Sequence, residues 1–173
     1  MDTNLPFAAD ATANEGGIDL ARPGQRAAAR LIEYKRGHHV ALAPHATIEL
    51  IERPALVEVP GAAYYACGLM SWQGRQLPVV DLDTLLRAYP SEYRLPWRYG
   101  LVVAYQVAPR APVQHGVLAL PALPQTVVVG DEAQCELPTD SDLWPLIALS
   151  CFQHDGHPVP IIDCGRVFGA AHH

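Results

Sequence analysis

The sequence predicts an all-β protein made of two similar units, and three observations support this. Pro and Gly are frequent, with 16 and 13 copies in 173 residues, which is typical of short strands joined by many turns. Short strand-like apolar runs recur along the chain. The stretch Gly74–Leu86 is repeated at Gly156–Phe168, with Gly, Pro, a pair of branched apolar residues and Asp in register. The repeat indicates two copies of one small unit.

The amino-acid composition and the net charge exclude several classes of protein. Half of the residues are hydrophobic, so a chain of this length can bury a core, and the net charge of −6 argues against a nucleic-acid partner. No apolar run approaches the roughly 18 residues of a membrane span, and the first 20 residues carry four acids and no Lys or Arg, unlike a signal peptide. We therefore expect a cytoplasmic protein whose four cysteines are buried, reduced thiols.

The first ordered element is expected after an N-terminal arm. Residues 1–26 show neither strand nor helix periodicity, so we predict a disordered arm. From residue 29 the pattern changes. Leu31–Tyr34 and Val40–Ala43 flank a polar, Gly-containing turn and predict a hairpin, and Ile48–Ile51 continues as a further strand.

A second hairpin is predicted around Gln73–Gly74. Gly68–Trp72 and Arg75–Val80 are its strands, and Gly74 can adopt the positive φ that a two-residue turn needs. Pro78 lacks an amide hydrogen, so we expect its strand to lie at a sheet edge or to carry a bulge.

Each copy of the repeat ends in an aspartate that fits a helix N-cap. Asp81 precedes one apolar stripe at helical spacing, formed by Leu82, Leu85, Leu86 and Tyr89, and Pro90 should end that helix. Asp163 stands at the equivalent place in the second copy. We expect both aspartates to be structural.

The second half repeats the order of strands. Leu101–Tyr105, Gly116–Leu120 and Thr126–Val129 are predicted strands, and the acidic segment 130–143 should be an exposed loop. Trp144–Phe152 is predicted as a strand-rich run that leads into the second closing hairpin.

Two chemical constellations compete with a purely structural interpretation. Cys151, His154, His157 and Cys164 have residue types that bind zinc, and Cys151, His154 and Asp163 have those of a nucleophile, base and orienting acid. The register of the repeat argues against zinc, because it places Cys164 opposite Leu82, an apolar helix position. It argues against catalysis because Asp163 repeats Asp81, which has no such Cys and His neighbours. We therefore expect no metal, no cofactor and no catalysis.

Polar residues around the first closing hairpin are the better functional candidates. Gln73 and Arg75 lie at its tip, Glu49 lies in the preceding strand, and Trp72 is a large ring beside the turn. Strand ends and turns are where a rigid β scaffold presents groups to a partner. These four residues are the predicted protein-interaction site, with a solvated surface and a core tryptophan as the alternatives.

At this point the residues support a resemblance. Gly68–Leu82 resembles the central signature of the CheW family, the coupling proteins of bacterial chemosensory arrays. Glu49–Gly61 is similar to that family's Glu-Val strand and the Pro-Gly turn that follows it. Leu31–Leu42 resembles the opening hairpin of the family, and Gly156–Phe168 resembles its closing strand with Leu-Asp. The likeness covers residues 29–168, which we take as one CheW-like domain.

The resemblance implies two five-stranded SH3-like barrels that share a core. It further implies a non-catalytic adaptor that binds the regulatory domain of a CheA-type histidine kinase and the cytoplasmic tip of a chemoreceptor, within arrays at the inner membrane. Gln73 stands where the family has Arg, while its partner position, Glu49, is kept, so a charged contact between the two is lost. This departure indicates a divergent member, for example in a type IV pilus system. The alternative is a β-barrel module that senses a small ligand or tethers an unrelated complex.

Overall fold

The computed structural model describes residues 24–88 and 97–170, and the remaining residues lie outside the described part. Strands dominate these ranges. In chain order the elements are β1 (Arg26–Lys35), β2 (His38–Leu42), η1 (Pro44–Ala46), β3 (Thr47–Glu52), β4 (Leu56–Val57), β5 (Ala66–Trp72), β6 (Arg75–Val80), α1 (Leu82–Arg87), β7 (Tyr99–Tyr105), β8 (Gln114–Leu120), β9 (Gln125–Gly130), η2 (Asp131–Ala133), α2 (Trp144–Ile147), β10 (Ala148–His154), β11 (His157–Ile162) and α3 (Cys164–Ala170).

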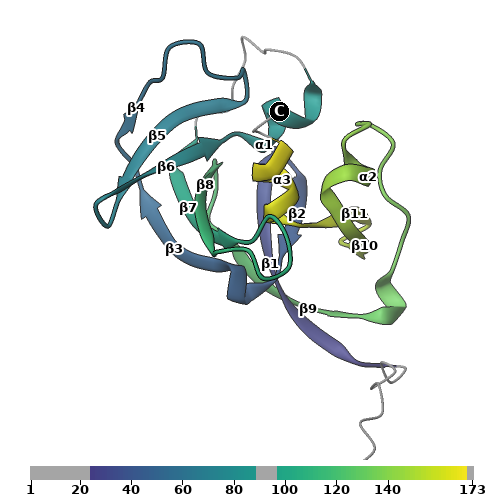
Figure 1. The fold of residues 1–173 in the computed structure, drawn as a ribbon. Helices are drawn as coiled ribbons and strands as arrows, with labels where there is room; N and C mark the ends of the chain where they lie inside the picture. Colours follow the sequence, from purple (N-terminus) through teal and green to yellow (C-terminus); the bar gives the residue numbers. More distant parts are fainter. Residues whose placement is uncertain (1–23, 89–96, 171–173) are drawn as a thin grey trace, which may run out of the picture.

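The strands form two sheets. One has five strands in the order β10-β11-β2-β1-β9, and the other has six in the order β3-β7-β8-β6-β5-β4. Figure 1 shows the six-stranded sheet on the left and the five-stranded sheet on the right, with α3 between them. The predicted all-β class is confirmed. The sixth strand is the two-residue β4, which pairs with β5 through Leu56 and Met70.

The two halves of the chain exchange a hairpin. β1 and β2 come from the first half but pair with β9 and β11, whereas β7 and β8 come from the second half and pair with β3 and β6. Of these joining ladders, β1–β9 and β3–β7 are antiparallel, whereas β2–β11 and β6–β8 are parallel, with Ile161 opposite Ala41 and Val79 opposite Val117. β2 and β8 therefore hold equivalent places, and each barrel contains strands of both halves.

A common apolar core joins the sheets. It includes Ile32 and Leu42 from the five-stranded sheet and Leu118 from the six-stranded sheet, each at most 1% exposed. Phe168 of α3 enters the same core and stacks on Tyr105 with ring centroids 4.9 Å apart. Each sheet also has a smaller cluster of its own, so the structure matches two units packed through one shared core.

Two details differ from the expectations at the strand level. β1 begins at Arg26, inside the predicted arm, because Arg26 to Ala29 pair with Gly130 to Val127 of β9. The rest of the predicted arm lies outside the described residues. β6, which contains Pro78, is an interior strand, and the bulge lies in its partner β5 between Ala66 and Gly68. Pro78 is tolerated there because the ladder to β8 covers only Val79 and Val80.

The start of the predicted Trp144–Phe152 strand is wrong. Trp144–Ile147 is a short helix, and β10 begins only at Ala148. Pro145 lies in the first turn, where a missing amide hydrogen removes no helical bond, and the amide of Ile147 donates to the carbonyl of Leu143 at 3.1 Å.

The ends of both closing hairpins follow the pattern of the repeat. Asp81 Oδ1 accepts from the amide of Asp83 at 3.1 Å, and its Oδ2 accepts from the hydroxyl of Thr84 at 2.7 Å. Asp163 Oδ1 accepts from the amide of Gly165 at 2.8 Å. Helix α1 ends at Arg87, so the predicted contribution of Tyr89 falls outside the described residues.

Candidate functional site

The β5–β6 hairpin presents its tip to solvent. Gln73 and Gly74 have φ values of 47° and 73°, the two left-handed positions of a type I′ turn, and both are exposed. Asp155 and Gly156 repeat this turn in the second copy. A type I′ turn matches the twist of the flanking strands, so the tip holds Trp72 and Arg75 directly opposite each other.

Trp72, beside the turn of this hairpin, holds Glu49 in place. The indole Nε1–H of Trp72 donates to Oε2 of Glu49 at 2.7 Å, although the two residues are on β5 and β3. Trp72 is only 8% exposed and packs in the smaller core cluster of the six-stranded sheet, so its ring does not protrude as a binding anchor. An ionised acceptor strengthens such a bond, and the contact fixes the position of the exposed Glu49 carboxylate.

His115 of β8 completes the cluster. Its ring lies 5.0 Å from that of Trp72, and its Nδ1 accepts from Nη2 of Arg75 at 2.7 Å. The guanidinium of Arg75 also lies 6.0 Å from the centre of the Trp72 ring, within cation–π range. Partial burial and then the charge of Arg75 lower the pKa of His115, which keeps Nδ1 available as an acceptor.

The site thus unites three of the predicted residues and adds one. Glu49, Trp72 and Arg75 are linked through side-chain contacts, whereas Gln73 lies at the exposed tip. Sequence reasoning missed His115 because β8 is brought beside β6 only by the exchange of hairpins. It also expected Glu49 to lose its charged contact, but the neighbouring Trp72 supplies a neutral donor in its place.

The edge of the six-stranded sheet lies beside this cluster. β3 is the first strand of the sheet, and Ile48 and Leu50 on either side of Glu49 are 47% and 37% exposed. An edge strand carries unpaired backbone donors and acceptors, and exposed branched side chains on it form a surface that a partner strand or helix can cover.

A groove lies where the two sheets meet. Its volume is about 530 Å³, and it is bordered by β2, β7, β10, β11 and α3. Val113 and Leu149 on its rim are 55% and 60% exposed. The groove is therefore mainly apolar and open to solvent.

The cysteine and histidine candidates do not come together. Cys151 is buried on β10, His154 lies 3.4 Å from the carboxylate of Asp155, and His157 bonds the carbonyl of Asp155 at 2.9 Å. Cys164 is 5% exposed at the start of α3. Within residues 24–88 and 97–170, no group of three or more potential ligands is placed to hold a metal ion.

All four cysteines are thiols, and two of them are neighbours. The Sγ atoms of Cys135 and Cys151 are 3.1 Å apart, and the amide of Cys135 donates to the carbonyl of Cys151 at 3.0 Å. Burial, followed by the contact with Cys135, raises the pKa of Cys151 to about 12. Burial raises that of Cys164 to about 12 as well.

The described residues thus form two intertwined SH3-like barrels with an exposed edge strand and an apolar groove. The CheW-like domain model matches residues 36–172, and the chain belongs to that family. A similar solved structure is the scaffolding protein TtCheW from Thermoanaerobacter tengcongensis, with a TM-score of 0.61 and 12% identity over 82% of this chain and 90% of that one. No curated protein matches the chain closely enough to be compared.

The family fixes the general class of function. Its members are non-catalytic scaffold and adaptor proteins of chemotaxis signal transduction, and the resemblance seen in the sequence is confirmed. In the described part of the chain, none of the helices is both long and apolar enough to cross a membrane.

Proposed function

We propose that this protein is a non-catalytic adaptor that couples chemoreceptors to a CheA-type histidine kinase. It would act in the cytoplasm, at receptor arrays on the inner membrane. The observation that carries the proposal is the edge strand β3, which combines exposed Ile48 and Leu50 with a Glu49 carboxylate held in place by Trp72. An edge of this kind offers backbone pairing, apolar contact and one oriented charge to a protein partner.

The groove between the sheets is the second proposed contact surface. Its apolar rim, with Val113 and Leu149 exposed, fits the apolar face of an amphipathic helix, as in the helical tip of a chemoreceptor. In this proposal the kinase regulatory domain binds at β3 and the receptor binds at the groove, which begins beside the start of β3 at His45 and Ala46.

The departure at Gln73 bears on the choice of partner. A neutral amide at the hairpin tip leaves Arg75 as the cation of the cluster, and Arg75 is turned toward His115 and Trp72. A partner surface that contacts the neutral Gln73 therefore needs less negative charge than one that contacts an arginine at this position. We propose that the protein serves a divergent chemosensory system, such as one that controls type IV pili.

A binding titration tests the proposal. The full chain is titrated with the kinase regulatory domain and with the receptor tip from the same organism, and we expect retention of each at micromolar concentration. Glu49→Lys should weaken the kinase complex by about tenfold, since it reverses a charge and breaks the bond from Trp72. Glu136→Lys, an exposed acid in the segment before α2, is the matched control and should leave affinity unchanged.

Gln73→Arg is the complementary variant. It adds a cation near Glu49 and should alter the affinity for the kinase or the receptor. If neither partner is retained at micromolar concentration, the adaptor proposal is wrong. If the partners bind but the titration curves of both variants match the parent, then Glu49 and Gln73 are only solvated surface residues.

A further inference from the structure

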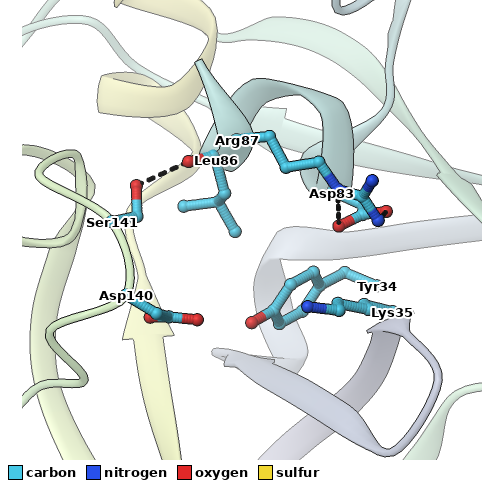
Figure 2. A pocket seen from close by; sticks show the side chains of 7 residues that line it. All are labelled: Tyr34, Lys35, Asp83, Leu86, Arg87, Asp140 and Ser141. Carbon is cyan, nitrogen blue, oxygen red and sulfur yellow. Dashed lines mark hydrogen bonds and ion pairs between the residues drawn. The ribbon is translucent and has the colours of Figure 1, made fainter. Parts of the chain in front are cut away.

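A polar cavity of about 370 Å³ lies outside the proposed interaction surfaces. It is enclosed by the end of β1, the helix α1 and the segment before α2, as Figure 2 shows. The residues that line it are Tyr34, Lys35, Asp83, Leu86, Arg87, Asp140 and Ser141. They come from three distant parts of the sequence.

A bulge in β1 turns two consecutive side chains into this cavity. Neighbouring residues of a regular strand point to opposite faces, yet Tyr34 and Lys35 both line the cavity. The register between β1 and β2 shifts here, since Glu33 pairs with His39 and Lys35 with His38. Bulges redirect side chains in this way and are common beside binding sites.

The hydroxyl of Tyr34 opens into the cavity without a partner. The side chain is buried, with the residue only 7% exposed, and its ring packs edge-on against Trp144 at 5.9 Å. No side chain or backbone group of the described residues forms a hydrogen bond with it. Among the described residues, every side-chain polar atom that is fully buried has a hydrogen-bond partner. Because the Tyr34 hydroxyl has none, its oxygen must be accessible from the cavity. Burial, and then Asp140 and Asp83, raise the pKa of Tyr34, so it stays a donor.

The charged side chains of the lining are the ion-paired Arg87 and Asp83, the carboxylate of Asp140 and the ammonium of Lys35. Arg87 and Asp83 bind each other, with Nη2 and Oδ2 2.7 Å apart. Asp140 Oδ1 accepts from Trp144 Nε1 at 2.8 Å, which leaves its second oxygen available. Lys35 forms no ion pair within the described residues. In Figure 2 the Tyr34 hydroxyl points across the cavity toward Asp140, and Lys35 extends from the same strand as Tyr34.

We propose that this cavity binds a small zwitterion of the α-amino-acid type. Lys35 takes the carboxylate, the second oxygen of Asp140 takes the ammonium, and the Tyr34 hydroxyl donates to the carboxylate between them. The side chain of Leu86 provides an apolar wall for the rest of the ligand. A ligand with both charges pairs with both Lys35 and Asp140, whereas one with a single charge leaves the other side chain without an opposite charge.

The chain offers an unusually clean probe, because Lys35 is its only lysine. The amines of the full-length protein are methylated with formaldehyde and a hydride donor in excess. Mass spectrometry of peptides then measures the modification of Lys35 and of the N-terminal amine separately. L-Leucine at millimolar concentration should slow modification of Lys35 at least severalfold relative to the N-terminal amine, which reports how much reagent the amine of the ligand itself consumes. The single-charge analogues 4-methylpentanoate and 3-methylbutylamine should protect much less.

Three variants locate the binding. Tyr34→Phe removes only the hydroxyl, and Asp140→Asn keeps an oxygen for Trp144 while removing the charge. Each should reduce the affinity for leucine by about tenfold in calorimetric titration. Asp142→Asn, an exposed neighbour outside the lining, should have no effect. Circular dichroism checks that the variants remain folded.

Two outcomes overturn the proposal. One is the absence of both Lys35 protection and heat of binding with leucine and with a second amino acid, glycine, at millimolar concentration. The other is equal protection by the analogue that lacks the amine, because this would show a simple anion site at Lys35.

Discussion

Replacing Phe168 with alanine should destabilise both barrels together. Phe168 is 1% exposed, stacks on Tyr105 at an interplanar angle of 7°, and lies in the core that contains strands of both sheets. Its ring also fills the space left by the missing side chain of Gly116, where an added Cβ would meet the ring carbons. The backbone at Gly116 has no side chain that could move into the vacated space.

The expected loss is about 4 kcal/mol, near the upper part of the range for Phe→Ala in a core that collapses poorly. For a chain of this size that corresponds to roughly a 10 °C fall in the melting temperature. The assay is urea unfolding followed both by tryptophan fluorescence and by far-ultraviolet circular dichroism, with Phe168→Leu as a milder control.

The two probes should give one coincident transition in the parent and in the variant, because the core is shared. A loss below about 1 kcal/mol would show that the ring is not tightly packed against Gly116. Two separate transitions would refute the reasoning more deeply, since the barrels would then unfold independently.

Three further results are expected. Asp81→Ala removes the acceptor of two bonds at the start of α1 and should cost about 1 to 2 kcal/mol in urea unfolding, whereas Asp81→Asn should cost less; equal losses would contradict a capping role. At pH 8 an alkylating reagent should spare Cys151 and Cys164 in the folded protein, because the pKa of each is raised to about 12, and should reach them only after unfolding. In an NMR titration the pKa of His115 should lie below its ordinary value of 6.5 and should rise in Arg75→Gln. Because the folded state resists protonation of His115, the stability of the protein should fall as the pH falls through 6.5. An identical titration of His115 in Arg75→Gln would disprove the contact.

Local chemistry made much of the fold predictable. Gly74 and Gly156 mark turns that need positive φ, and Asp81 precedes an apolar stripe at helical spacing, so hairpins and helix starts could be placed from short windows. The repeat then showed that the same unit occurs twice.

Features that depend on distant pairing could not be predicted in this way. Arg26 becomes part of a strand only because β9 lies beside it, and Pro78 lies in an interior strand because β8 pairs only with the residues after it. The helix at Trp144–Ile147 is four residues long, too short for periodicity to show.

Some residues of the candidate site could be predicted from local sequence, and others could not. Trp72 and Arg75 flank the turn of one hairpin and Glu49 lies on β3, all within stretches that carry the family resemblance. His115 is separated from Arg75 by 40 residues, and nothing in its neighbourhood in the sequence marks it. The cavity at Tyr34 was missed for a similar reason, since the bulge that turns Tyr34 and Lys35 together depends on the register with β2.

The exchanged hairpin also sets the order in which this protein can be completed during synthesis. A chain emerging from the ribosome makes β1 and β2 before their outer partners, since β9 begins at Gln125 and β11 begins at His157. The six-stranded sheet can close once Leu120 has emerged, while both outer edges of the β1–β2 hairpin are still unpaired, because β9 and β11 follow later in the chain. A nascent chain therefore exposes apolar strand edges until β9 and β11 have been made, and unpaired edges of this kind make incomplete chains prone to aggregation.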